Sequence, residues 1–301
     1  MGRFSRLFKV VRAKIGQIGL LSFVTLAARK VIERVWRPRC KCADLCRSYV
    51  GGGHGLEIGG PSRFFSGIGQ IPLYDVAAQI DGLNFSSETV WATTSGEDQP
   101  FVFGKKVLGR QFVREASHFP DIDTGTFDFV LSSQAIEHMA NPLRGLCEWA
   151  RVLREGGVLV LVVPHKDATF DHRRPVTTLE HILEDFSNDM GEDDETHIPE
   201  VLELHDFSRD FWACNREEFK IRCEDNMRNR CLHHHVFDTG LAVHMVDRAG
   251  FRVLAVEPVP SNNIVILCVK PLAGEVVDNL AHLDAGAEWR KSSPFPSDRA
   301  G

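Results

Sequence analysis

The segment 141–164 constrains the fold of this 301-residue chain most strongly. It opens with an Asn-Pro pair that favours a helix start, and apolar side chains then recur at helical spacing. The pair Gly156-Gly157 ends that pattern, and residues 158–163 are all Val or Leu. A strand without polar alternation is buried on both faces, which is typical of a parallel sheet covered by helices on both sides.

Other short apolar segments extend this pattern along the chain. Residues 56–58 and 127–131 precede the buried strand, and residues 251–256 and 264–269 follow a helical pattern at 239–249. We therefore predict an α/β fold, a Rossmann-like doubly wound and mostly parallel seven-stranded sheet. The segment between the two sets of strands is polar and holds seven of the 13 histidines. We interpret it as a cap inserted after the fifth strand, at residues 166–238.

Charge separates an N-terminal arm from the rest of the chain, and composition separates a C-terminal tail. Residues 1–41 carry 11 Lys or Arg and one acid, a net +10, so the remaining residues sum to −16 in a chain of net −6. An acidic body repels phosphate, which argues against a nucleic-acid binder. We predict a basic arm (1–41), a main domain (42–270) and a mobile tail (271–301) rich in Ser, Pro and Asp.

The basic arm allows three interpretations. Arg3, Arg6 and Lys9 alternate with Phe4 and other apolar residues at helical spacing, as in an amphipathic helix on an anionic membrane surface. A helix that packs on the domain is the second reading, and a secretory signal with its apolar run at 18–28 is the third. We favour the first, at the inner face of the membrane of a cytoplasmic protein. No apolar run reaches the 18 residues of a spanning helix.

Eight cysteines are too few for a disulfide scaffold in a chain of this length, so we infer a reducing compartment. Cys40, Cys42 and Cys46 form a C-x-C-x3-C cluster, and His54 is the one candidate for a fourth zinc ligand. Because this spacing matches no common zinc ribbon, we expect unliganded thiols.

A glycine turn follows the first strand directly, in Leu56-Glu57-Ile58-Gly59-Gly60. Such a turn lets a ligand approach the backbone at the carboxyl edge of a sheet. It is not the G-x-G-x-x-G loop of dinucleotide-binding proteins, because Pro61 and Phe64 occupy the later glycine positions.

Taken in order, five strings resemble a known family: residues 56–60, 114–116, 127–133, 136–138 and 152–157. At this spacing they look like class I methyltransferases that use S-adenosylmethionine, particularly the type 11 group. The strings at 163–166 (VPHK), 171–175 (DHRRP) and 233–237 (HHHVF) are similar to a bacterial subset of these enzymes. The resemblance implies S-adenosyl-L-methionine as cofactor.

The resemblance also implies a set of cofactor-binding residues. Glu57, Gly59 and Gly60 would line the amino-acid and ribose end, Glu115 and Ala116 would meet the adenine, and Ser133 would lie beside the sulfonium. The acid that usually binds the ribose hydroxyls has two candidates, Asn84 and Asp81, because Asn84 stands where Asp or Glu is usual. The full set is Glu57, Gly59, Gly60, Asp81, Asn84, Glu115, Ala116 and Ser133.

Polar residues near the sheet edge are candidates for acceptor chemistry. A hydroxyl acceptor needs a base, and histidine is the usual provider near neutral pH. The candidates are His138 after the fourth strand, His165 after the fifth, and Asp171 and His172 at the start of the cap. The cap histidines have three readings, namely an acceptor pocket, a structural polar network and a divalent metal site completed by aspartate. We favour the acceptor pocket and assign no residue to a metal.

Together these features predict methyl transfer from S-adenosylmethionine to a small molecule or glycan. Two alternatives are a binding or regulatory protein that keeps the cofactor fold without turnover, and a metal-dependent hydrolase that uses the histidine-rich cap. The partners we expect are a saccharide or other small acceptor and, through residues 1–41, an anionic membrane surface.

Overall fold

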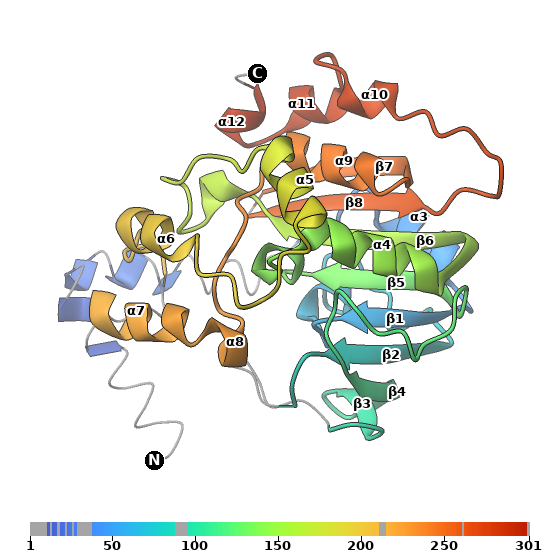
Figure 1. The fold of residues 1–301 in the computed structure, drawn as a ribbon, viewed down its shortest axis with the longest axis horizontal. Helices are drawn as coiled ribbons and strands as arrows, with labels where there is room; N and C mark the ends of the chain where they lie inside the picture. Colours follow the sequence, from blue (N-terminus) through green and yellow to red (C-terminus); the bar gives the residue numbers. More distant parts are fainter. Residues whose placement is uncertain are drawn as a thin grey trace.

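The computed structural model describes residues 11–12, 14–16, 19–21, 23–25, 27–28, 38–87, 96–210, 215–260 and 262–299. These residues form an eight-stranded sheet with helices on both faces (Figure 1). The strands are β1 (His54–Ile58), β2 (Gln79–Asn84), β3 (Pro100–Phe103), β4 (Lys106–Val113), β5 (Phe127–Ser133), β6 (Leu153–Pro164), β7 (Arg252–Val259) and β8 (Asn263–Val269).

The sheet has the order β3-β4-β2-β1-β5-β6-β8-β7. Its five central strands, from β4 to β6, pair in parallel, whereas β8, β7 and the edge strand β3 pair antiparallel to their neighbours. This confirms the mostly parallel α/β prediction. The sequence pattern gave no range for β2, β3 or β4, and the sheet has eight strands where seven were predicted. The edge strand β3 pairs only with β4, as a hairpin, and so lacks the buried pattern of a central strand. The strand order reverses between β1 and β5, where α/β folds bind ligands.

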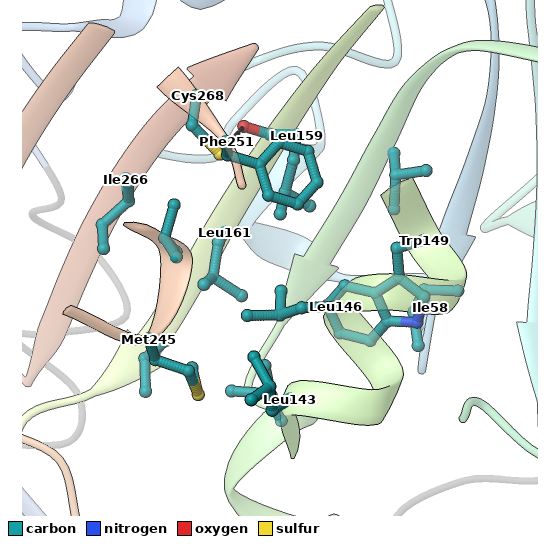
Figure 2. Close-up of a cluster of buried hydrophobic side chains, with 14 of the residues drawn as sticks. Ile58, Leu143, Leu146, Trp149, Leu159, Leu161, Met245, Phe251, Ile266 and Cys268 are labelled. Atoms are coloured by element: carbon teal, nitrogen blue, oxygen red, sulfur yellow. Dashed lines mark hydrogen bonds between the residues drawn. The ribbon is translucent and has the colours of Figure 1, made fainter. Parts of the chain in front are cut away.

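One face of the sheet is covered by α4 (Pro142–Val152), α5 (Leu179–Ser187) and α9 (Thr239–Arg248). The Asn141 side chain accepts a hydrogen bond from Arg144 N at 3.0 Å, as predicted for the helix start. Leucines and Trp149 of α4 meet Leu159 and Leu161 of β6 and Met245 of α9 (Figure 2). Each fully buried side chain of this kind contributes about 1.5–3 kcal/mol.

The opposite face is covered by α3 (Ala43–Val50) and the short η1 helix (Arg63–Phe65). Cys40, Cys42 and Cys46 are buried in this core as free thiols. His54, the candidate fourth ligand, instead pairs through Nε2 with Asp81 Oδ2 at 2.8 Å.

The cap lies beyond the carboxyl ends of the central strands, on the left of Figure 1. The cap begins with η3 (Lys166–Ala168) and α5 and continues with α6 (Ile198–Leu204), α7 (Arg216–Glu224) and α8 (Asn226–Asn229). The η2 turn (Ile136–His138) precedes it, just after β5. A small apolar cluster of its own joins α6 to α7 through Val201, Phe219 and Cys223.

The described part of the arm is helical at residues 11–12, 14–16, 20–21, 23–25 and 27–28. Lys14 is buried against the cap, where its Nζ donates to Phe207 O. Leu20, Leu21 and Val24 are exposed. The predicted residues Arg3, Arg6, Lys9 and Phe4 lie outside the described residues. Within the described part of the chain, no helix is long and apolar enough to cross a bilayer.

The tail differs from the mobile segment that its composition suggested. Residues 271–299 contain α10 (Leu280–Leu283), α11 (Glu288–Ser292) and α12 (Pro296–Arg299). Trp289 and Phe295 are buried, and Asp298 Oδ2 accepts hydrogen bonds from Thr239 Oγ1 and Ser293 Oγ at 2.7 and 2.6 Å. A few buried contacts therefore hold a segment that is otherwise polar.

Candidate functional site

A cavity of about 510 Å³ opens at the carboxyl ends of β1, β2, β4 and β5, beneath the cap. Its sheet side includes residues at the ends of these strands or just after them: Ile58, Gly59, Gly60, Pro61, Asn84, Phe85, Glu115, Ala116, Gln134 and Ala135. Its cap side includes Thr169, Phe170, Glu192, Asp210, Arg222, Arg230, Cys231 and His233. Volumes of about 300–1,000 Å³ are typical of sites for drug-sized ligands.

The glycine turn after β1 depends on glycine at both positions. Gly59 has a φ of +73°, a conformation that other residues rarely adopt. A Cβ on Gly60 would lie 2.4 Å from the Glu57 carboxyl carbon. Both glycines line the cavity, so the backbone itself forms this part of the wall.

Glu57 lies beneath that turn and does not line the cavity. Its Oε1 accepts a hydrogen bond from Ser62 N at 2.8 Å, and its Oε2 accepts one from Tyr74 Oη at 2.8 Å. The side chain is fully buried, and this burial raises the pKa of Glu57 to about 8. Glu57 therefore shapes the glycine turn from below.

The two candidates for the ribose acid on β2 separate in the structure. Asn84 lines the cavity, and its Nδ2 donates to Gly60 O at 2.8 Å. Asp81 lies nearer the start of the strand, where it bonds His54 Nε2 and accepts from Arg110 N, each at 2.8 Å. Asp81 does not line the cavity, so Asn84 is the residue of this pair that can meet a ligand.

Glu115 and Ala116 follow β4 and line the cavity. Glu115 Oε2 accepts from Arg230 Nη2 at 2.7 Å, and Arg230 Nη1 lies 2.8 Å from Glu192 Oε2. The Arg230 guanidinium is also 5.3 Å from the centre of the Phe85 ring. Arg230 thus connects the cap to the sheet edge, a role that no sequence pattern indicated.

Ser133 is half-buried at the end of β5 and is not part of the cavity wall. Its neighbours Gln134 and Ala135 line the cavity instead. Gln134 has a φ of +56°, so the chain turns sharply after the strand and brings these two residues to the wall.

A histidine and an aspartate of the cap form a close pair at the cavity. His233 lines it, and its Nδ1 lies 2.6 Å from Asp171 Oδ2. Arg174 Nη1 donates to the other Asp171 oxygen at 3.2 Å and to His233 O at 2.8 Å. Burial raises the pKa of Asp171, but the charges of His233 and Arg174 outweigh it and lower the pKa to about 2. Asp171 therefore stays ionised and orients the His233 ring.

Two further polar residues lie beside this pair. His138 lines the cavity, and its Nδ1 donates to Leu232 O at 3.1 Å. Glu137 also lines it, and its Oε2 is buried with no hydrogen-bond partner among the described residues. Burial raises the pKa of Glu137 to about 7. The sequence pattern indicated His138 as a candidate but not Glu137, although both belong to the string at residues 136–138.

The remaining two predicted acceptor residues lie elsewhere. His165 is fully buried outside the cavity, with Nε2 3.1 Å from Asp298 Oδ1 and its ring stacked on Phe295 at 3.8 Å. His172 Nε2 lies 2.9 Å from Asp206 Oδ2, also outside the cavity. Proximity to the strand end suggested both residues, but α12 covers His165 and the chain turns His172 toward Asp206.

One family model and one curated relative match part of this chain. Residues 64–161 match a family model described as a methyltransferase domain. Phosphatidylethanolamine N-methyltransferase of Cereibacter sphaeroides is 29% identical over 140 residues, which are 46% of this chain and 63% of that protein. The chain thus spans less than two thirds of this relative.

Solved structures with a similar fold include two methyltransferases that depend on S-adenosylmethionine. The protein from Aquifex aeolicus is 12% identical and covers 80% of this chain and 97% of its own, with a TM-score of 0.41. The protein from Mesorhizobium loti is 14% identical and covers 73% and 92%, with a TM-score of 0.42.

The family match, the sheet order and the glycine turn at its switch point define a class I methyltransferase domain that depends on S-adenosylmethionine. Within that class, the family model matches residues 64–161, about a third of the chain. The wall residues fit the cofactor, because Gly59 and Gly60 line the cavity without side chains and Glu115 offers a carboxylate acceptor.

Proposed function

We propose that this protein transfers a methyl group from S-adenosylmethionine to a hydroxyl of a small polar molecule or saccharide. The observation that carries the proposal is the His233–Asp171 pair, which lies on the cap side of the cavity whose sheet side is formed by Gly59 and Glu115. A base and the cofactor loops therefore share one cavity.

S-adenosylmethionine supplies a methyl group that its sulfonium already activates, so the protein needs no covalent nucleophile. Gly59, Gly60, Asn84 and Glu115 bind and orient the cofactor in this proposal. The remaining tasks are to exclude water, align the acceptor and remove its proton.

His233 is the proposed base. Its Nδ1 donates a hydrogen bond to Asp171, which keeps a proton on Nδ1 and raises the pKa of His233. Above that pKa, Nε2 is free to accept the proton of the acceptor hydroxyl. A positioned base of this kind typically contributes about 10² to 10⁴-fold in rate. Asp171 acts as a positioning residue, because it orients the ring and does not itself line the cavity.

The polarity of the cap side supports a hydroxylated acceptor. Glu137, Glu192, Asp210 and Arg222 all line the cavity, next to the apolar Phe170. The buried Glu137 Oε2 can accept a hydrogen bond from a ligand, and the ring of Phe170 offers a flat apolar surface. Mixed hydrogen-bonding and aromatic groups suit a sugar-like molecule.

An amine of a phospholipid headgroup is a second candidate acceptor. It is supported by the relative from Cereibacter sphaeroides and by the acidic lining residues Glu137 and Glu192, which would attract an ammonium group. Leu20, Leu21 and Val24 of the arm are exposed apolar residues next to a basic sequence, which supports contact with an anionic membrane surface.

Isothermal titration with S-adenosylmethionine and S-adenosylhomocysteine tests the cofactor half of the proposal, and a chain that binds neither would contradict it. Labelled methyl transfer into separated polar and lipid fractions of a cell extract tests the acceptor half. Label in a saccharide or other polar hydroxyl compound supports the first acceptor class, and label in ethanolamine phospholipid supports the second. Cofactor binding without label in either fraction would indicate a binding protein.

A further inference from the structure

A second group of titratable side chains lies in the cap, outside the cavity. It consists of His181 on α5, His197 just before α6 and His235 after α8, and one ligand nitrogen from each lies within 4.8 Å of the others. None of the three lines the cavity. Three separate segments of the cap therefore direct imidazole nitrogens to one point.

Asp185 completes this group from the same helix as His181. The two residues are four apart, which puts them on one face of α5. Asp185 Oδ2 lies 3.5 Å from His181 Nε2 and 3.5 Å from His235 Nε2. The side chain is 3% exposed, and this oxygen has no hydrogen-bond partner among the residues that the structure describes. Burying a carboxylate oxygen without a partner costs free energy, and a cation bound at this position would offset that cost.

The tautomer of His197 is set by a neighbouring carboxylate. His197 Nδ1 lies 2.7 Å from Asp194 Oδ2, and Asp194 Oδ1 accepts from Thr196 N at 2.9 Å. Donation from Nδ1 leaves the lone pair of His197 on Nε2, which lies 3.0 Å from His181 Nε2. A carboxylate behind a histidine in this manner is the usual outer partner of a metal-binding imidazole.

His235 offers a nitrogen of the same kind. Its ring is fully buried, Nε2 lies 3.2 Å from Ala140 O, and Nδ1 has no hydrogen-bond partner within the described part of the chain. Neither His181 nor Asp185 supplies a hydrogen bond to this ring at the distances observed. Nε2 is the nitrogen that faces Asp185, at 3.5 Å. Bound to an ion through Nε2, the ring would carry its proton on Nδ1, and the ion would replace the contact with Ala140 O.

From this geometry we propose a divalent cation site, with zinc as the preferred ion, formed by His181, Asp185, His197 and His235. Zn–N bonds of about 2.0–2.1 Å in a tetrahedron place neighbouring ligand atoms about 3.3 Å apart. The separations of 3.0, 3.5 and 3.5 Å are close to this value. Three imidazoles and one carboxylate form a closed set of nitrogen and oxygen ligands, which suits a structural rather than a catalytic ion.

Such an ion would join α5, the turn before α6 and the segment of residues 233–235. That segment also carries His233 into the cavity. The site therefore has a mechanical role in this proposal, because it fixes a wall of the cavity without contacting a ligand there. It does not depend on the identity of the methyl acceptor.

Metal analysis of the full chain, produced without a polyhistidine tag, tests the proposal. We expect about one zinc per chain as purified, or after chelator treatment one site in a Zn²⁺ titration. The His181→Gln and Asp185→Asn variants are expected to weaken Zn²⁺ binding at least tenfold. His181 is 39% exposed, so its variant is expected to fold, which circular dichroism checks. X-ray absorption at the zinc edge should show nitrogen and oxygen neighbours and no sulfur.

The matched control is His233→Gln, in a second group (Glu137, His138 and His233) whose ligand atoms also lie within 4.8 Å of one another but which lines the cavity. We expect this variant to retain zinc. The proposal is overturned if the folded chain takes up no zinc, cobalt, nickel or iron either as purified or on titration. It is equally overturned if His181→Gln and Asp185→Asn bind zinc like the unmodified chain, or if only His233→Gln loses it.

Discussion

The two sides of the cavity are built in different ways. On the sheet side, Gly59, Asn84 and Glu115 are placed by the ends of parallel strands, and Gly59 contributes backbone alone. On the cap side, His233 is placed by side-chain contacts with Asp171 and Arg174, which are about 60 positions away in the sequence. A substitution on the sheet side therefore acts through backbone shape, whereas one on the cap side acts through partners that are far apart in the chain.

The largest expected effect is on the cap side. Asp171→Asn and His233→Gln should each lower the methyl-transfer rate by about 10² to 10⁴-fold, because they remove the oriented base. The double variant should lose no more activity than the more damaging of the two single variants, since both substitutions act through one ring. The measurement is labelled methyl transfer to the identified acceptor, with His244→Gln as the control histidine. Additive losses would contradict a shared role.

The next effect concerns the carboxyl beneath the sheet-side loop. Because burial raises the pKa of Glu57 to about 8 from an ordinary 4.5, the folded protein retains a proton that the unfolded chain releases. Its contribution to stability is fully present below pH 4.5 and is lost as the pH rises toward 8, with a slope of about 1.4 kcal/mol per pH unit. Glu57→Gln should flatten this part of the profile of denaturant unfolding.

The exposed Glu155 offers a comparison, because Glu155→Gln removes one carboxylate without touching the glycine turn. Its unfolding profile between pH 5 and 8 should follow that of the unmodified chain. An equal slope for all three proteins would contradict the titration of Glu57 in the folded state.

Gly59→Ala tests the dependence of the sheet side on backbone shape. Alanine at a φ of +73° costs about 1–2 kcal/mol, and its Cβ would lie 3.0 Å from that of Ala135 on the cavity wall. We expect about a tenfold loss of S-adenosylhomocysteine affinity by titration calorimetry. Gly52 has the same φ of +73° with open space around it, so Gly52→Ala should lose similar stability but keep its affinity. Equal affinities for both variants would contradict a role of the glycine turn at Gly59 in cofactor binding.

The smallest expected effect separates the two polar residues of β2. Asn84→Ala should weaken S-adenosylhomocysteine binding severalfold, about the contribution of one hydrogen bond, because Asn84 lines the cavity. Asp81→Asn should leave affinity within about twofold and lower the thermal midpoint, since Asp81 pairs with His54 away from the cavity. The reverse outcome would indicate that the ligand contacts Asp81 and not Asn84.

The same contrast explains what the sequence could predict. Strand ends are marked by apolar runs and glycine, so Gly59, Glu115 and His138 were predicted at the sheet edge, and all three line the cavity. Glu57 and Ser133 belong to the same strings but not to the wall. A string locates a strand end, yet it does not tell which way each side chain points.

The cap was harder to predict from the sequence, because the residues that pair within it lie far apart in the chain. The sequence drew attention to the histidines but not to the pairing of His233 with Asp171 across 62 positions, nor to the reach of Arg230 to Glu115 across 115. It also suggested His165 for the acceptor side, whereas Phe295 stacks on that ring. Such contacts depend on how the cap and tail fold back, which no local pattern records.

The carboxylate of Asp298 connects three distant parts of the chain: His165 after β6, Thr239 at the start of α9, and Ser293. Shortening the protein by even the few residues from Pro296 onward would strand these donors inside the fold. Each buried donor left without a partner costs about 1–3 kcal/mol. Deleting this segment is thus equivalent to mutating the interior of the fold.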